Sequence, residues 1–131
     1  MSLRAAFTVA ASASLALSLT GCAKEPKPPN DAGCYTVVFP KTKGGDYRFN
    51  LVKANSPDLE HCAASLEVNR IEYLTHGGNR TDFWGVYQGH YIYINSSGLY
   101  SANSIDGMQY PLLVRTGDGR LARPGSVANP Q

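Results

Sequence analysis

Residues 83–95 read FWGVYQGHYIYIN, and this stretch decides which fold the chain adopts. Two runs of aromatic and β-branched residues, 83–87 and 91–95, flank a short Gln-Gly-His segment. Such runs on either side of a turn are typical of β-strands, and a short connection makes neighbouring strands antiparallel. Gly85 interrupts the first run and is expected to mark a β-bulge. The stretch therefore predicts the centre of an antiparallel sheet.

A second pair of strands is predicted earlier in the chain. Residues 34–39 are β-branched and aromatic, and residues 47–52 alternate large apolar with polar side chains. The segment between them, 40–45, contains Pro, Lys and a Gly pair, which is a turn signal. The two strands should form a hairpin.

Shorter segments complete the predicted sheet. One strand candidate, residues 71–74, precedes a turn at 76–80. Later turns at Ser96-Ser97-Gly98, Asp106-Gly107 and Gly117-Asp118-Gly119 separate a short segment, 99–101, from a last strand, 112–115.

A single helix is predicted between the hairpin and these strands. Ser56 is a suitable N-cap, and Pro57 suits the first helical turn. Leu59, Cys62, Ala63 and Leu66 follow the i, i+3, i+4, i+7 spacing of one apolar helix face. The pattern predicts about ten residues of helix, ending at Asn69.

Two strands, a helix and four or five further strands predict an α+β fold. We expect one domain over residues 34–121, with a mostly antiparallel sheet and one short packed helix. A small β-barrel or roll capped by the helix is the nearest variant.

The start of the chain has a different character. Arg4 precedes an uncharged, largely apolar run over residues 5–21. A basic start, an apolar stretch and small residues at its end are the pattern of a secretory signal peptide, expected here over residues 1–21. The run is short for a membrane-spanning helix, which needs roughly 20 predominantly apolar residues.

The end of this run, Leu19-Thr20-Gly21-Cys22, resembles the lipobox of bacterial lipoproteins. The resemblance covers the first 22 residues and implies cleavage after Gly21. It also implies diacylglycerol on the Cys22 sulfur and a fatty acid such as palmitate on its amine. The protein would then be attached to a membrane of the cell envelope through Cys22. The alternative is a soluble secreted protein with an ordinary thiol there.

Residues 22–33 contain three prolines and no apolar periodicity, which predicts an extended tether. In lipoproteins of double-membrane bacteria, an Asp after the lipidated Cys commonly causes retention at the inner membrane. Ala23 occupies that position, which favours the outer membrane, facing the periplasm. Residues 122–131 carry two prolines and are expected to be a disordered tail.

Once Cys22 carries lipid, Cys34 and Cys62 remain. In an exported domain they are expected to form a disulfide. Two unpaired buried cysteines, or a catalytic thiol at Cys62 beside His61, are the alternatives. A catalytic thiol is disfavoured because neighbouring residues on a helix point in directions about 100° apart.

The net charge of the chain gives no reason to expect a strongly charged partner such as nucleic acid. The formal net charge is +2, and a signal peptide would take Arg4 with it. A nearly neutral domain should attract neither nucleic acid nor anionic lipid. His61, His76 and His90 lack the spacing of a metal site, and no catalytic motif occurs. We therefore predict no catalytic residues, no metal and no cofactor.

The aromatic residues of the sheet are the candidate binding surface. Tyr91 and Tyr93 share one face of their strand, and Ile92 and Ile94 share the other. The isoleucines are the better core candidates, so Tyr91, Tyr93, Trp84 and Tyr100 are expected to offer an exposed face. Such a face suits an envelope protein or a glycan, although ordinary sheet packing would use the same residues.

Residues 96–102, SSGLYSA, resemble the Ser- and Gly-rich loop of periplasmic lipoproteins that inhibit c-type lysozyme. That family loop is longer and usually carries a basic side chain between its Gly and Tyr, where only Leu99 stands. Three functions follow. The leading one is a non-enzymatic binding or scaffolding lipoprotein. A lysozyme inhibitor with a protruding loop is the alternative, and a small cell-wall hydrolase is disfavoured.

Overall fold

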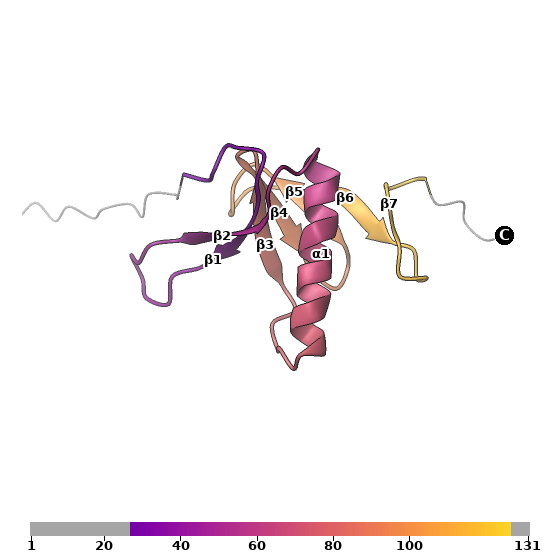
Figure 1. Ribbon diagram of the computed structural model, residues 1–131, viewed down its shortest axis with the longest axis horizontal. Helices are drawn as coiled ribbons and strands as arrows, with labels where there is room; N and C mark the ends of the chain where they lie inside the picture. Colours follow the sequence, from indigo (N-terminus) through magenta and orange to yellow (C-terminus); the bar gives the residue numbers. More distant parts are fainter. Residues whose placement is uncertain (1–26, 127–131) are drawn as a thin grey trace, which may run out of the picture.

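The computed structural model describes residues 27–126, which form one antiparallel sheet and one helix (Figure 1). The predicted signal peptide and Cys22 lie outside the described residues. The elements in chain order are β1 (Cys34–Val38), β2 (Arg48–Lys53), α1 (Leu59–Thr75), β3 (Phe83–Tyr87), β4 (His90–Ile94), β5 (Leu99–Ala102), β6 (Gln109–Arg115) and β7 (Leu121–Ala122).

The sheet has seven strands in the order β2-β1-β3-β4-β5-β6-β7. Every pairing is antiparallel, as the short connections predict. The order has two ends, β2 and β7, so the sheet is open and not a closed barrel. The α+β class and the mostly antiparallel sheet are confirmed. The two-residue strand β7 was not predicted, and Ala122 lies in it, although a disordered tail was expected from residue 122.

The helix differs from the prediction at both ends. Its N-cap is Asp58, whose carboxylate accepts a hydrogen bond from the His61 amide at 2.8 Å. Ser56 lies two residues before this cap and is buried, where its amide donates to Ala32 and its carbonyl accepts from the Tyr87 hydroxyl.

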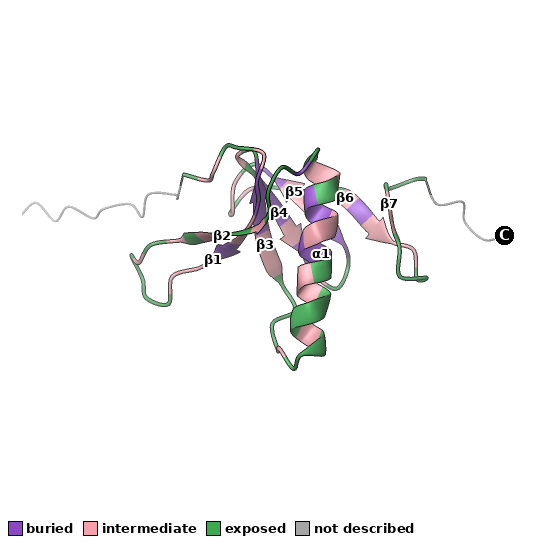
Figure 2. Cartoon of the chain, viewed as in Figure 1, coloured by how far each residue is buried: buried purple, intermediate pink, exposed green. Residues whose placement is uncertain are grey.

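At its other end, α1 continues to Thr75 and is 17 residues long. The strand predicted at 71–74 is therefore wrong. Tyr73, in this last part of the helix, packs against Phe83 of β3 with ring centroids 5.4 Å apart. That tertiary contact outweighs the strand preference of the local sequence. Figure 2 shows that the C-terminal part of α1 is largely exposed.

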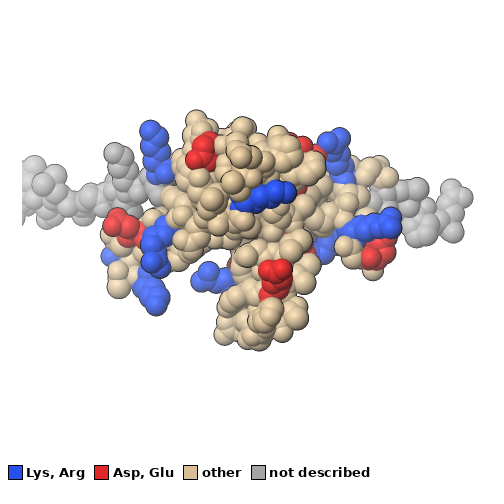
Figure 3. All heavy atoms as spheres, in the orientation of Figure 1, with Lys and Arg blue, Asp and Glu red and all other residues tan. Residues whose placement is uncertain are grey.

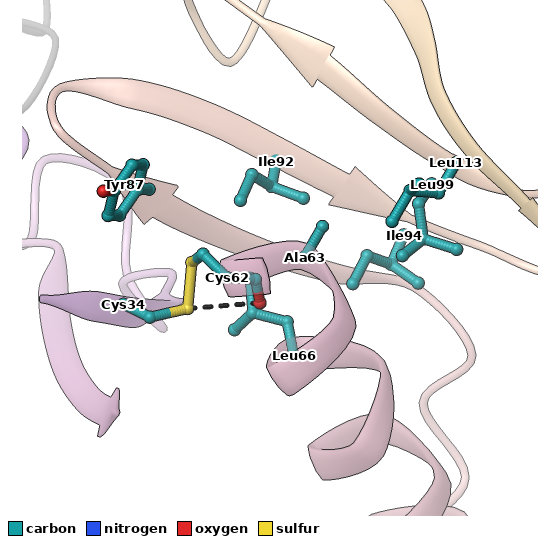
Figure 4. Packing of buried hydrophobic residues seen from close by; sticks show 9 residues of the cluster. All are labelled: Cys34, Cys62, Ala63, Leu66, Tyr87, Ile92, Ile94, Leu99 and Leu113. Atoms are coloured by element: carbon teal, nitrogen blue, oxygen red, sulfur yellow. Dashed lines mark hydrogen bonds between the residues drawn. A yellow bond between two sulfur atoms is a disulfide. The ribbon is translucent and has the colours of Figure 1, made fainter. Parts of the chain in front are cut away.

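One core lies between α1 and the sheet. The side chains of α1 meet those of β3, β4, β5 and β6, as Figure 4 shows. Its buried members are Cys34, Cys62, Ala63, Leu66, Tyr87, Ile92, Ile94, Leu99 and Leu113. The predicted disulfide joins Cys34 to Cys62, with Cα atoms 5.3 Å apart, and so ties α1 to β1. This core contains the two isoleucines assigned to it from the sequence.

Gly85 lies under the helix and forms no bulge. The β3–β4 register runs without interruption from Phe83–Ile94 to Tyr87–His90. A Cβ atom on Gly85 would lie only 2.2 Å from a methyl carbon of Leu66. The glycine is therefore explained by the close approach of α1 to the sheet.

A second core lies on the face of the sheet opposite α1. Its buried residues are Val37, Val86, Tyr91 and Ala102, and none of its members belongs to the helix. Half-buried side chains from the loops cover it, among them Phe39, Tyr47 and Ile105. The sheet is thus packed on both faces, which the single predicted helix did not suggest.

The segment just before β1 is attached to the domain. The Pro29 carbonyl accepts from the Gly89 amide at 2.9 Å, and the Ala32 carbonyl accepts from the Ser56 amide at 2.8 Å. Gly33 is buried. The end of the predicted tether, residues 29–33, is therefore part of the packed structure. At the other terminus, Arg123 pairs with Glu60 of α1 at 2.7 Å.

Candidate functional site

Three aromatic side chains form a continuous row across the face opposite α1. Trp84 of β3 lies directly across from Tyr93 of β4, which lies directly across from Tyr100 of β5. Ring centroids are 4.7 Å apart for the first pair and 6.3 Å for the second. We call these three half-buried residues the aromatic row.

Neighbouring rings of the row are tilted relative to one another, by 38° for Trp84 and Tyr93 and by 35° for Tyr93 and Tyr100. A centroid separation of 4.7 Å between Trp84 and Tyr93 is too short for rings side by side in one plane, so their faces overlap. Trp84 and Tyr93 therefore stack in part, and each ring covers some of the other's face. Phe39 lengthens the row at its other side, with its ring 6.4 Å from that of Trp84 in an edge-to-face arrangement.

The hydroxyl groups give the row a polar margin. The Tyr93 hydroxyl donates to Asp82 Oδ2 at 3.1 Å. Burial and the Asp82 carboxylate raise the pKa of Tyr93, and they outweigh the opposing effect of a hydrogen bond with Asn95. The Tyr93 hydroxyl therefore stays protonated and acts as a donor. Within residues 27–126 the Tyr100 hydroxyl has no hydrogen-bond partner, and it is available to a ligand.

A cleft of about 520 Å³ adjoins the row where β1 ends and β3 begins. Phe39 and Trp84 contribute aromatic surface to it, while Asn79, Arg80 and Asp82 contribute polar groups. Trp84 belongs to both features, and Asp82 of the cleft accepts the hydrogen bond of Tyr93, so the row and the cleft form one continuous surface. An aromatic surface with a few polar groups beside it is the usual composition of a binding site.

Of the four residues predicted for the binding surface, Tyr91 is the one that the structure buries. It is only 2% exposed and belongs to the second core. Its ring meets that of Trp84 edge to face at 6.3 Å. Tyr91 supports the aromatic row from below, so the expectation of an exposed Tyr91 is wrong, whereas Trp84, Tyr93 and Tyr100 are at least partly accessible.

The turn that resembles the lysozyme-inhibitor loop is short and tightly held. The Asn95 amide donates to the Gly98 carbonyl, and the Asn95 side chain accepts from the amides of Ser97 and Gly98. Leu99 is fully buried in the first core. The segment therefore begins with a compact turn between β4 and β5.

Beside this turn lies a polar cluster that sequence analysis did not anticipate. The Glu67 carboxylate, 5% exposed as a residue, accepts two hydrogen bonds from Arg70 and two from Arg115. Arg115 also donates to the carbonyls of Asn95 and Ser96. The cluster joins α1, β6 and the turn between β4 and β5. The only sequence signal for it was the i, i+3 spacing of Glu67 and Arg70.

The histidines lie apart from this cluster and from the row. His61 is in the first turn of α1 and contacts Asp58, His76 follows the end of α1, and His90 begins β4. Among residues 27–126, no group of three or more His, Cys, Asp or Glu side chains is placed to bind a metal ion. Within the same range, no helix has both the length and the apolar character needed to cross a bilayer.

Comparisons with protein-family models, with curated proteins and with solved structures find no match for this chain.

Proposed function

We propose that this protein is a lipid-anchored lipoprotein of the bacterial envelope that binds an envelope component without chemical turnover. The carrying observation is the aromatic row with its adjoining cleft. Tyr and Trp are the residues most often found at the energetic centres of binding interfaces. The partner is a glycan or a protein of the envelope, and it would contact the rings of the row, the Tyr100 hydroxyl and the polar side of the cleft.

The lipid anchor of this proposal rests on the sequence before the domain. A basic residue, an uncharged run and Leu19-Thr20-Gly21-Cys22 support export and lipidation at Cys22. Two or three acyl chains suffice for lasting attachment, since each buried methylene contributes about 0.8 kcal/mol. Ala23 supports the outer membrane as the destination, with the domain in the periplasm.

Replacing Cys22 tests the anchor. The variant Cys22→Ala should accumulate as an uncut precursor and incorporate no labelled palmitate, because no thiol is left to carry the diacylglycerol. The measurement is metabolic labelling followed by mass spectrometry of the N-terminus. Cys34→Ala serves as the matched control and should still be labelled. Cleavage of Cys22→Ala at the same bond, with an unlabelled wild type, would rule out the lipoprotein assignment.

Photo-crosslinking tests the binding surface. A benzophenone amino acid at Tyr100 should capture an envelope component in cells, whereas the same group at Val68, 55% exposed on α1, should not. The double variant Tyr93→Ser/Trp84→Ser should reduce capture tenfold or more, since interface aromatics commonly contribute more than 1 kcal/mol each.

The matched control for this loss is Tyr110→Ser, which removes a tyrosine that is 53% exposed on β6. It should leave capture unchanged. The captured product also identifies the partner as glycan or protein, by digestion with a glycan hydrolase or a protease. Equal capture from Tyr100 and Val68 would exclude the aromatic row as the binding surface.

A further inference from the structure

The small net charge of the domain conceals a separation of its cations. Within residues 27–126, every arginine of α1, β6 and the segment after it, namely Arg70, Arg115, Arg120 and Arg123, lies in an ion pair. Apart from Arg80 in the loop between α1 and β3, the described cations without an ion pair are on the N-terminal side: these are Lys27, Lys41, Lys43, Arg48 and Lys53, all of them exposed. One acidic residue, Asp46, lies in the loop between β1 and β2.

These free cations lie at one end of the molecule. The loop between β1 and β2 and the segment 27–33 occupy the same end of the fold, at the left of Figure 1. Figure 3 shows several blue side chains and a single red one around the loop at that end. The β1–β2 loop forms the most distant part of this end, and its residues Lys41 and Lys43 are exposed.

The base of the loop is aromatic. Phe39 and Tyr47, at its two sides, pack edge to face with centroids 5.3 Å apart. A hollow of about 540 Å³ lies between these rings, the two lysines and Gly44. Lysines beyond a half-buried aromatic base are the arrangement found at membrane–water interfaces, where aromatic rings lie at the level of the headgroups.

The chain itself limits how far this end can lie from an anchor at Cys22. Residues 29–33 are attached to the domain by hydrogen bonds to Ser56 and Gly89, so they add no reach. Lys27 is five positions after Cys22, and five fully extended residues span at most about 18 Å. Lys27 is therefore held close to the surface that an anchor at Cys22 would occupy, and the β1–β2 loop lies on the same side of the fold.

We propose that the β1–β2 loop docks on anionic phospholipid headgroups through Lys41 and Lys43, and so orients the domain on its membrane. This inference rests on the proposed lipid anchor. Each lysine near an anionic surface contributes roughly a fivefold increase in binding. In this orientation the aromatic row begins beside the docked loop, where Phe39 meets Trp84, and runs away from the lipid to Tyr100 on β5, while β7 lies at the far end of the sheet.

The test uses the mature lipoprotein in vesicles, with a fluorophore on Thr42→Cys in the loop. Lipidation at Cys22 and the Cys34–Cys62 disulfide leave the introduced thiol as the reactive one. Headgroup-labelled quencher lipid should quench the fluorophore in vesicles containing about a third phosphatidylglycerol, but not in phosphatidylcholine alone. Salt at about 0.5 M should abolish quenching, because the Debye length falls to a few ångströms.

The variant Lys41→Gln/Lys43→Gln should lower the ratio of docked to undocked domain roughly 25-fold. The matched control, Arg120→Gln/Arg123→Gln, removes two exposed cations at the other end and should behave like the wild type. Flotation of vesicles is measured in parallel. If the protein does not float with the vesicles, the lipid anchor is overturned. If it floats but quenching does not depend on lipid charge, on salt or on the two lysines, only the docking is overturned.

Discussion

The variant Glu67→Ala should lower the free energy of unfolding by about 3–5 kcal/mol, because it leaves two guanidinium groups without their common carboxylate. The side chains of Arg70 and Arg115 are only 11% and 26% exposed, so water cannot fully replace the lost partner. Arg115 also holds the carbonyls of the turn between β4 and β5, and the loss should extend to that turn.

The matched control is Glu60→Ala. Glu60 accepts two hydrogen bonds from Arg123, but the Arg123 side chain is 72% exposed, and a pair of this kind contributes less than about 1 kcal/mol. Urea unfolding of both variants compares the two carboxylates directly. If both variants lose the same free energy of unfolding, burial adds nothing to the stability that the Glu67 cluster provides.

The same carboxylate makes stability depend on pH in a definite direction. Burial acts to raise the pKa of Glu67, but the hydrogen bonds and charges of Arg70 and Arg115 outweigh it and lower the pKa below its ordinary value of 4.5. The stabilisation is therefore complete above about pH 4.5 and is lost as the pH falls through the lower, folded-state pKa. The difference in stability between the wild type and Glu67→Gln should narrow over that acidic range.

Removing the disulfide should have an effect of similar size. The bridge closes a loop with a sequence separation of 28, for which the chain-entropy model gives roughly 3–4 kcal/mol. The variant Cys34→Ala/Cys62→Ala should therefore unfold at a melting temperature lower by on the order of 20 °C. Thermal unfolding followed by circular dichroism measures this shift.

The bridge itself is checked by thiol labelling of protein taken from the envelope. Both cysteines are fully buried, so labelling must be done in denaturant, where a free thiol would react. Neither Cys34 nor Cys62 should be labelled unless a reductant is added. Labelling of either cysteine without reductant would show that the disulfide is absent, and the predicted loss of stability would then have no basis.

Most of the strands could be predicted because their residues are aromatic and β-branched and their turns contain glycine. The α1 boundaries could not, because Tyr73 is held in a helix by Phe83, a partner ten residues further along the chain. Local preference favours a strand there, and packing reverses it.

The candidate surface was predicted in part for a related reason. Alternation correctly placed Tyr91 and Tyr93 on one face and Ile92 and Ile94 on the other. It could not show that loop residues such as Phe39 and Ile105 pack against the core that contains Tyr91, whereas Tyr93 stays half-buried. The Glu67–Arg115 contact spans 48 residues and has no pattern in the sequence at all.

The strand order has a consequence for how the domain folds. The strands from β3 to β7 each pair with the next along the chain, so their contacts close over short loops. The β1–β3 pairing instead joins Cys34 to Tyr87 across the whole helix. Closing that long loop carries the larger entropic cost, so the β3–β7 meander is expected to form early and the β1–β2 hairpin to join it late. In native-state hydrogen exchange, the edge strand β2 should accordingly open at a lower free energy than β4, which lies in the middle of the sheet.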